Sequence, residues 1–88
     1  METYRVLWKR SARQDLKKIS PQYIPSIIKA IELLEENPLP PGCRKLVTTE
    51  RFYRIRIGDY RVTYEMNPKK REVTIYYIKH RREAYRKL

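Results

Sequence analysis

Three arginines within one short segment are the residues of this sequence whose type and spacing could do chemistry. Arg54, Arg56 and Arg61 lie in two stretches, 52–57 and 60–66, that alternate between apolar and polar residues on either side of Gly58-Asp59. Alternation about a two-residue turn of this kind predicts a β-hairpin. The spacing therefore decides which side chains share a face of the sheet.

The register of this hairpin separates its side chains into an apolar face and a basic face. The apolar face holds three cross-strand pairs: Ile57 opposite Tyr60, Ile55 opposite Val62 and Tyr53 opposite Tyr64. The other face holds Arg56 opposite Arg61, Arg54 opposite Thr63 and Phe52 opposite Glu65. Like charges opposed across strands cost about 0.2–1 kcal/mol per pair. An external anion would relieve that repulsion, and a solvated basic face is the alternative interpretation.

The next strand, residues 72–79, adds aromatic and titratable candidates to the basic face. If this strand is regular, Val73, Ile75 and Tyr77 are buried, and Tyr76, Ile78 and His80 share the arginine face. Arg81 follows the strand, and Tyr85 lies four residues later. An aromatic ring beside arginines suits stacking on an unpaired RNA base, with guanidinium groups on phosphates, although Tyr76 could equally be an ordinary sheet aromatic.

Few other catalytic groups are present in the sequence. It has no paired-carboxylate signature, no Gly-rich phosphate loop and no convincing Ser or Cys nucleophile motif, and Cys43 follows a Pro-Gly pair without a clear His partner. Metal-free RNA cleavage remains feasible with Arg, Tyr and His, because the ribose 2′-hydroxyl supplies the nucleophile. The protein would then neutralise the phosphorane and transfer protons.

Composition favours a single small domain with a polyanionic partner. The 88 residues carry 21 Lys and Arg against 10 Asp and Glu, a net charge of +11, of which +8 belongs to residues 45–88. This imbalance points to nucleic acid or an acidic protein. One Cys and one His exclude a disulfide framework and the usual structural zinc sites. No apolar run approaches a membrane span and no signal peptide is apparent, so we expect a cytoplasmic protein without metal, cofactor or membrane contact.

The remaining sequence supplies the elements that must position these residues. Residues 3–8 are rich in strand formers, Ser11 is a candidate N-cap for a helix through Lys18, and Ser20-Pro21 restarts helical spacing. Pro25 disfavours a helix interior, so the regular second helix could begin there instead. Its apolar stripe consists of Ile24, Ile27, Ile28, Ile31 and Leu34.

The predicted fold is α+β in one domain over residues 1–88. An N-terminal strand and a helical hairpin precede a three-stranded antiparallel meander that completes a four-stranded sheet, with a short C-terminal helix or tail.

Residues 53–64 (YRIRIGDYRVTY) resemble the signature hairpin of the RelE/ParE toxin superfamily of type II toxin–antitoxin systems. Lys45-Leu46, residues 80–85 and the order of elements are also similar, so the resemblance covers nearly the entire chain. In its RelE branch, the resemblance implies a ribosome-dependent endoribonuclease that cleaves mRNA in the A site. It also implies an acidic antitoxin partner in a toxin–antitoxin hetero-oligomer.

The resemblance places site residues at Arg54, Arg56, Arg61, Arg81 and Tyr85, and our hypothesis gives each a role, with His80 as an alternative base. Arg61 and Arg56 would bind the reacting phosphate, Arg81 would support the leaving oxygen, and Arg54 would position the RNA backbone. Tyr85 or His80 would accept the 2′-hydroxyl proton, because arginine stays protonated and cannot act as a base. Tyr85 is favoured, since the resemblance supports a C-terminal tyrosine.

Two other functions remain open at this point. A ParE-like toxin would inhibit DNA gyrase without catalysis, and the hairpin would then be scaffold. A stand-alone RNA-binding module is the third interpretation. The arginine and tyrosine candidates favour the RelE branch.

Overall fold

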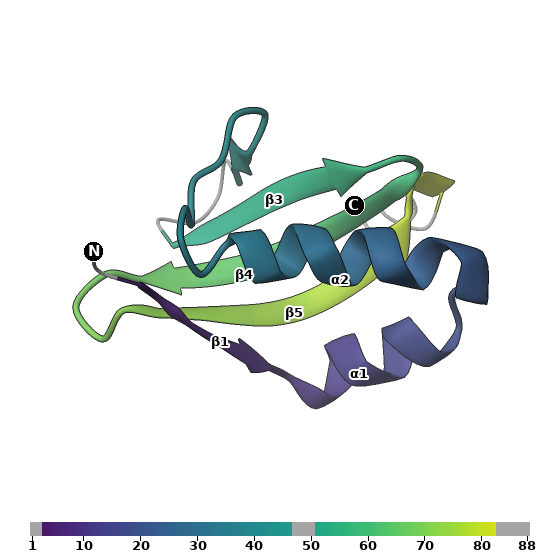
Figure 1. Cartoon of the computed structure of the whole chain (residues 1–88), viewed down its shortest axis with the longest axis horizontal. Coiled ribbons are helices and arrows are strands. Elements are labelled where there is room, and N and C mark those ends of the chain that lie inside the picture. The colour runs from purple at the N-terminus through teal and green to yellow at the C-terminus, as the bar shows by residue number, and fades with distance from the viewer. Residues whose placement is uncertain (1–2, 47–50, 83–88) are drawn as a thin grey trace.

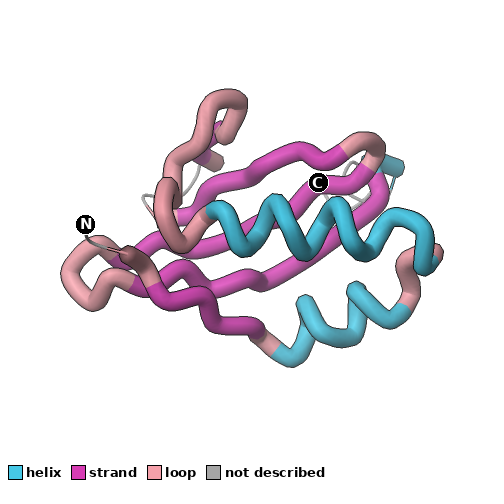
Figure 2. The backbone as a smooth tube through the Cα atoms, viewed as in Figure 1, coloured by secondary structure: helices cyan, strands magenta, loops and turns pink. Residues whose placement is uncertain are grey.

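The computed structural model describes residues 3–46 and 51–82, which form one mixed β-sheet with two helices on one face. The strand order is β1-β5-β4-β3-β2; β1 runs parallel to β5, and the other neighbours are antiparallel. Figures 1 and 2 show α2 lying across the sheet and α1 beyond the end of β1. In chain order the elements are β1 (Arg5–Trp8), α1 (Arg10–Lys17), the 3-10 helix η1 (Pro21–Tyr23), α2 (Ile24–Leu33), β2 (Arg44–Lys45), β3 (Phe52–Ile57), β4 (Tyr60–Asn67) and β5 (Glu72–His80).

This architecture confirms the predicted α+β fold and adds one strand to it. The sheet has five strands because Arg44 and Lys45 pair with Arg54 and Tyr53 to form β2. A two-residue strand has too few side chains to show a periodic pattern, so the expected four-stranded sheet was one strand short. The predicted C-terminal helix or tail falls largely on residues 83–88, outside the described residues.

The helix starts differ in part from those predicted. The N-cap of α1 is Lys9 and not Ser11, whose Oγ instead donates a hydrogen bond to the carbonyl of Tyr76, 2.6 Å away. The hydroxyl thus satisfies a strand carbonyl rather than a helix N–H. The second helix behaves as the position of Pro25 suggested: α2 begins at Ile24, with the proline in its first turn, where no helical N–H is required.

The core lies between the helices and the sheet. Ile27, Ile31 and Leu34 of the α2 segment are almost completely buried, as are Val62 and Tyr64 of β4. Truncating one such aliphatic side chain to alanine typically costs about 2–5 kcal/mol. Val62 and Tyr64 belong to the apolar face of the predicted hairpin, which therefore turns its other face away from the helices.

Tyr64 links the core to the loop after α2. Its hydroxyl donates a 2.6 Å hydrogen bond to the carbonyl of Pro38. Burial, with smaller contributions from Cys43 and Tyr53, raises the pKa of Tyr64 well above its ordinary value near 10. The phenol is therefore a neutral structural donor.

The hairpin between β3 and β4 has the predicted register at every position. The pairs run from Ile57 opposite Tyr60, beside the turn, to Phe52 opposite Glu65 at the far end, and Arg56 lies opposite Arg61. Gly58, at the turn, has a φ of +59°, a left-handed conformation that glycine adopts without steric cost. The turn therefore fixes the register of the arginines.

A β-bulge in β5 overturns part of the predicted facing. Thr63 pairs with Tyr77 but Tyr64 pairs with Ile75, so Tyr76 is an extra residue on β5. After Tyr76, each side chain of β5 therefore points to the opposite face of the sheet from the one it would occupy in a regular strand. Tyr77, predicted to be buried, is 43% exposed, and Ile78, predicted on the arginine face, is 2% exposed in the core. His80, also predicted on the arginine face, instead pairs with Tyr60 on the helix side.

Helix α1 holds β5 beyond the point where β1 ends. The last paired residues of β1 and β5 are Trp8 and Ile75. Farther along β5, the buried carboxylate of Asp15 accepts hydrogen bonds from the backbone N–H of Ile78 (3.0 Å) and from Nζ of Lys79 (2.8 Å). Side chains of α1 thus replace a neighbouring strand along the bulged part of β5.

No helix within residues 3–46 and 51–82 has the length and apolar character needed to cross a bilayer.

Candidate functional site

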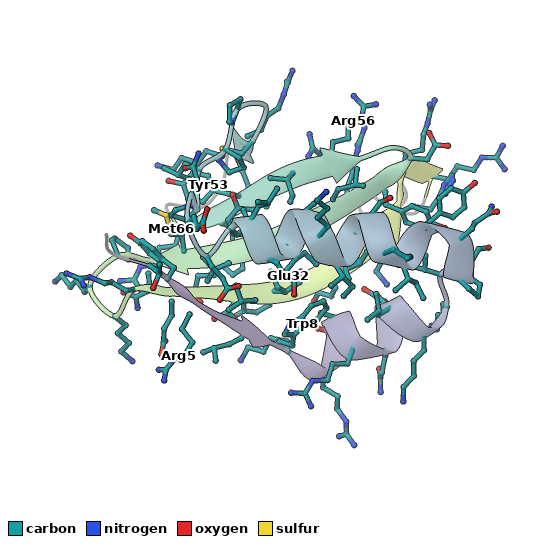
Figure 3. The ribbon with its side chains drawn as sticks, in the orientation of Figure 1. Arg5, Trp8, Glu32, Tyr53, Arg56 and Met66 are labelled. Carbon is teal, nitrogen blue, oxygen red and sulfur yellow. The ribbon has the colours of Figure 1, made fainter. Side chains whose placement is uncertain are left out.

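The sheet face opposite the helices, called here the open face, gathers arginines from three adjacent strands. Arg44 of β2 lies opposite Arg54 of β3, and Arg56 of β3 lies opposite Arg61 of β4. We call these four residues the arginine cluster. Figure 3 shows Arg56 extending away from the sheet near the turn end of β3. Lys79 of β5 pairs with Arg61, so Arg56, Arg61 and Lys79 form one row across three strands.

A pocket of about 630 Å³ lies along the edge of β3 and reaches all four arginines. Its other lining comes from α2 and from the following loop, including Leu33 and Pro40. β2 pairs with β3 only at Tyr53 and Arg54, and the pocket extends along β3 beyond that pairing. Its lining therefore includes Ile55 and Ile57 of the helix side as well as Arg56 of the open face. An anion in this pocket could contact guanidinium groups at the side of an apolar wall.

The members of the cluster differ in exposure. Arg56 is exposed and Arg54 is half-buried, whereas Arg61 is only 5% exposed. Removing a guanidinium from water is costly unless a compensating interaction is present. The pocket shelters these guanidinium groups in part from water, so an anion bound there would interact with them more strongly than an anion on an open surface would.

Several acidic residues have ion-pair partners away from the arginine cluster. Asp15 pairs with Lys79, and Glu72 pairs with Arg5 at the opposite end of β5. Asp59 lies in the hairpin turn, with its Oδ1 4.0 Å from Nη1 of Arg81. Among the described residues, these three carboxylates thus pair with Lys79, Arg5 and Arg81 rather than with a member of the arginine cluster.

Arg81 adjoins the turn of the hairpin. Its backbone N–H donates a 2.7 Å hydrogen bond to the carbonyl of Asp59, which fixes the end of β5 beside the turn. Both side chains of the Arg81–Asp59 pair are more than half exposed, so this ion pair is worth at most about 1 kcal/mol. The guanidinium can therefore leave Asp59 for another anion at little cost.

His80 is not part of the cluster, and its predicted position beside the arginines is wrong. Its ring makes an edge contact with Tyr60, with 5.4 Å between centroids, and Tyr60 in turn contacts Tyr23 of η1. Its Nδ1 accepts a 3.3 Å hydrogen bond from the backbone N–H of Arg82. The bulge accounts for this reversal, since the predicted facing assumed a regular strand. Tyr85, the other candidate base, lies outside the described residues.

Aromatic residues occupy the open face at the other end of the hairpin. Tyr76 lies there as predicted, in an edge-to-face contact with Phe52 at 4.9 Å, and its hydroxyl is 3.5 Å from Oε1 of Glu65. Tyr77, which was expected in the core, joins them, with its ring centroid 6.4 Å from that of Tyr76. Lys9 and Lys79 place ammonium groups 5.3 and 5.8 Å from these two ring centroids, respectively.

Two residues of this face were missed by the sequence analysis for different reasons. Arg44 belongs to a strand too short to recognise, although an arginine just before Lys45-Leu46 was a usable signal. Tyr77 follows Tyr76 in an unbroken run of strand formers, and nothing in that run marks a bulge.

Metal-binding side chains do not cluster in the described part of the chain: no group of three or more His, Cys, Asp or Glu residues could hold an ion there. Cys43 is half-buried and packs against the core near Tyr64. The thiol thus contributes to the packing of the core.

Comparison with known proteins gives consistent matches to bacterial and archaeal toxins. Residues 6–85 match the model of the family described as the ParE toxin of the type II toxin–antitoxin system parDE. The protein named toxin RelE1 of Methanocaldococcus jannaschii is 33% identical over 76 residues, which span 83% of this chain and 84% of that protein.

Solved structures show the same fold. A chain of the archaeal RelE–RelB complex from Pyrococcus horikoshii superimposes with a TM-score of 0.80 at 31% identity, covering 90% of this chain and 96% of that one. The isolated RelE toxin of Escherichia coli gives a TM-score of 0.77 at 18% identity, covering 96% and 97% of the two chains. At that identity the second likeness shows the fold alone.

Proposed function

Because this chain belongs to the ParE toxin family of type II toxin–antitoxin systems, within the RelE/ParE superfamily, we propose that it is a ribosome-dependent endoribonuclease that cleaves mRNA in the A site and inhibits translation. Its role as a toxin of such a system follows from the family. The arginine cluster on the open face supports the nuclease activity. Four guanidinium groups around one pocket match the negative charge and the oxygen geometry of an RNA phosphate.

The proposed reaction uses the nucleophile of the RNA itself. The ribose 2′-oxygen attacks the adjacent phosphorus, a 2′,3′-cyclic phosphate forms, and the bond from phosphorus to the 5′-oxygen breaks. One proton leaves the 2′-hydroxyl, and one is delivered to the departing 5′-oxygen. The extra negative charge develops on the non-bridging oxygens, where positioned donors reduce the barrier most.

The arginines among the described residues would bind the phosphate, position the RNA backbone and support the leaving oxygen. Arg61 and Arg56, opposed on neighbouring strands, would hold the reacting phosphate, and Arg54, in the next row, would hold the backbone beside it. Arg81, weakly tied to Asp59, could turn toward the leaving oxygen. None of these arginines can accept a proton. We assign the base role to Tyr85, on the resemblance, since His80 lies on the helix side.

We also propose an acidic antitoxin as the partner that controls this toxin in the cytoplasm. The matched archaeal structure is a RelE–RelB complex, and the present chain carries a net charge of +11. An acidic chain over the open face would neutralise the repulsion within the arginine cluster and block RNA from the pocket. A toxin–antitoxin hetero-oligomer is the expected resting form.

The decisive experiment measures cleavage of mRNA bound to purified ribosomes by primer extension. We expect wild-type protein to give cuts with codon spacing, and Arg61→Ala to reduce the cleavage rate by roughly 10²–10³-fold, as for the loss of one transition-state donor. Arg13→Ala, an exposed arginine of α1, serves as the matched control and should cleave normally. Near-normal cleavage by Arg61→Ala would disprove the assignment of this residue.

A second function is favoured by one finding, the match to the ParE family model over residues 6–85. In that case the protein would inhibit DNA gyrase without cutting RNA. A supercoiling assay with purified gyrase separates the two possibilities. Gyrase inhibition without mRNA cleavage would replace the nuclease proposal, and cleavage without inhibition would support it.

A further inference from the structure

The end of the open face away from the hairpin turn has a different chemistry from the arginine cluster. Phe52, Tyr76 and Tyr77 gather there, with Glu65 at the hydroxyl of Tyr76. The Glu65 carboxylate would repel a phosphate at the hydroxyl of Tyr76, whereas the ammonium groups of Lys9 and Lys79 lie beside the two tyrosine rings. Flat aromatic rings are instead the groups on which unpaired bases stack.

The position of Tyr77 makes its ring accessible. The bulge brings Tyr77 to the face that Tyr76 already occupies, and Tyr77 is 43% exposed whereas Tyr76 is half-buried. Tyr76 is packed against Phe52 on one side and lies near the ammonium of Lys9. These contacts hold Tyr76 beside the second tyrosine, whose ring centroid lies 6.4 Å from its own.

The same side chain adjoins the arginine cluster. Tyr77 pairs with Thr63, and Thr63 pairs with Arg54, so the ring lies in the row of an arginine assigned to the RNA backbone. The adjacent row, two residues along β3, holds Arg56 and Arg61. Two strand residues span about 7 Å and neighbouring strands lie about 5 Å apart, so the backbone positions of Tyr77 and Arg61 are separated by roughly 8 Å, a distance that a single-stranded segment bridges between a bound phosphate and a neighbouring base.

We propose that Tyr77, supported by Tyr76 and Phe52, forms a stacking subsite for one unpaired RNA base beside the arginine cluster. This inference rests on the proposed RNA substrate and assigns a specific base-binding position within it. Stacking does not read hydrogen-bonding edges, so the subsite should increase affinity for RNA of any sequence.

Binding of a short, uncleavable RNA tests the subsite apart from catalysis. The probe is a fluorescently labelled RNA hexamer with 2′-O-methyl riboses, compared with hexamers that carry one abasic residue at each position in turn, and affinity is measured by anisotropy. For wild-type protein we expect one abasic position to weaken binding roughly tenfold, within the range measured for loss of a stacked base. Tyr77→Ala should bind the intact hexamer about tenfold more weakly and should lose the dependence on that position.

Two further variants separate stacking from other roles of this residue. Tyr77→Phe keeps the ring and should bind as wild type does. Tyr23→Ala removes an exposed tyrosine from the helix side and should leave RNA affinity unchanged. Because Tyr77 is substantially exposed, Tyr77→Ala should unfold at a temperature close to that of the wild type, which is checked in the same samples.

Several results would overturn the subsite. These are wild-type affinity in Tyr77→Ala, no abasic dependence in the wild type, no binding of the hexamer at all, or equal losses in Tyr77→Phe and Tyr77→Ala. A loss of antitoxin affinity in Tyr77→Ala with unchanged RNA affinity would assign the ring to the antitoxin instead. Cleavage of ribosome-bound mRNA is measured in parallel, so that a wild-type protein that binds as expected but does not cut RNA disproves the nuclease proposal and leaves the subsite standing.

Discussion

Replacing Arg56 by glutamine should make the protein more stable and less active. Arg56 lies directly opposite Arg61 across β3 and β4, and its side chain is exposed, so the substitution removes a like-charge contact without opening a cavity. If the cluster is built to bind an anion, the protein without that anion retains an unfavourable repulsion. The two effects of Arg56→Gln therefore have opposite signs.

The size of the stability gain follows from the cross-strand geometry. Directly opposed like charges cost about 0.2–1 kcal/mol. For a domain of this size, 1 kcal/mol corresponds to a shift of about 4–8 °C in Tm, so the variant should unfold about 1–8 °C higher than the wild type. Hydrogen bonds to charged groups contribute about 1.5–3 kcal/mol, which predicts a roughly ten- to hundredfold loss of mRNA cleavage.

Thermal unfolding at low and high salt, together with cleavage of ribosome-bound mRNA, measures both effects. Lys29→Gln makes the same change in net charge on the exposed surface of α2 and serves as the control. The difference in Tm between Arg56→Gln and wild type should shrink between 0.1 M and 1 M salt, as the screening length falls from about 10 Å to about 3 Å. If Arg56→Gln is no more stable than Lys29→Gln at low salt, or if it cleaves RNA at the wild-type rate, the interpretation of the cluster as an anion site is refuted.

Three other substitutions test the parts of the structure that position the site. Asp15→Asn should lower the free energy of unfolding by roughly 2–3 kcal/mol in urea titrations, less than for a fully buried pair because the Lys79 side chain is 17% exposed, and Lys79→Met added to it should restore part of the loss. Tyr64→Phe should cost about 1 kcal/mol at pH 7 through loss of its hydrogen bond. Because the pKa of Tyr64 is raised in the folded state, its contribution is complete below pH 10 and is lost as the pH rises above that value, so the wild type should lose stability faster than Tyr64→Phe above pH 10, as measured by chemical unfolding at each pH. His80→Phe keeps a ring against Tyr60 and should cleave ribosome-bound mRNA as fast as the wild type, and a hundredfold loss would return the base role to this histidine.

The hairpin was predictable because its determinants are local. A two-residue turn with glycine in a left-handed conformation fixes the register, and the register fixes which residues oppose one another. Arg54, Arg56 and Arg61 could therefore be placed on one face from the sequence alone. The apolar stripe of α2, which contains Ile27 and Ile31, was predictable for the same reason, since the helical spacing of apolar residues is a local property of the sequence.

The facing of the residues after Tyr76 could not be predicted because its cause lies elsewhere in the chain. Ser11 bonds the carbonyl of Tyr76, and Asp15 bonds the N–H of Ile78, so α1 satisfies the backbone of the strand where the extra residue disrupts the ladder. Both contacts join residues more than 60 positions apart. Residues 72–79 were predicted to form a regular strand, and continuing its alternation would have placed His80 with the arginines.

The bulge therefore determines which chemistry the open face can offer. Without it, Tyr77 would face the core and His80 would stand near the arginine cluster, providing a base but no exposed ring beside Arg54. With it, the described part of the face combines guanidinium groups with an accessible aromatic ring, which are groups for binding RNA and stabilising charge rather than for accepting a proton. For the proposed nuclease, the arginine cluster therefore leaves proton transfer to another residue, a role that the resemblance assigns to Tyr85. The hydrogen bonds of Ser11 and Asp15 to β5 consequently connect α1 to the set of side chains on the open face, even though both residues belong to α1.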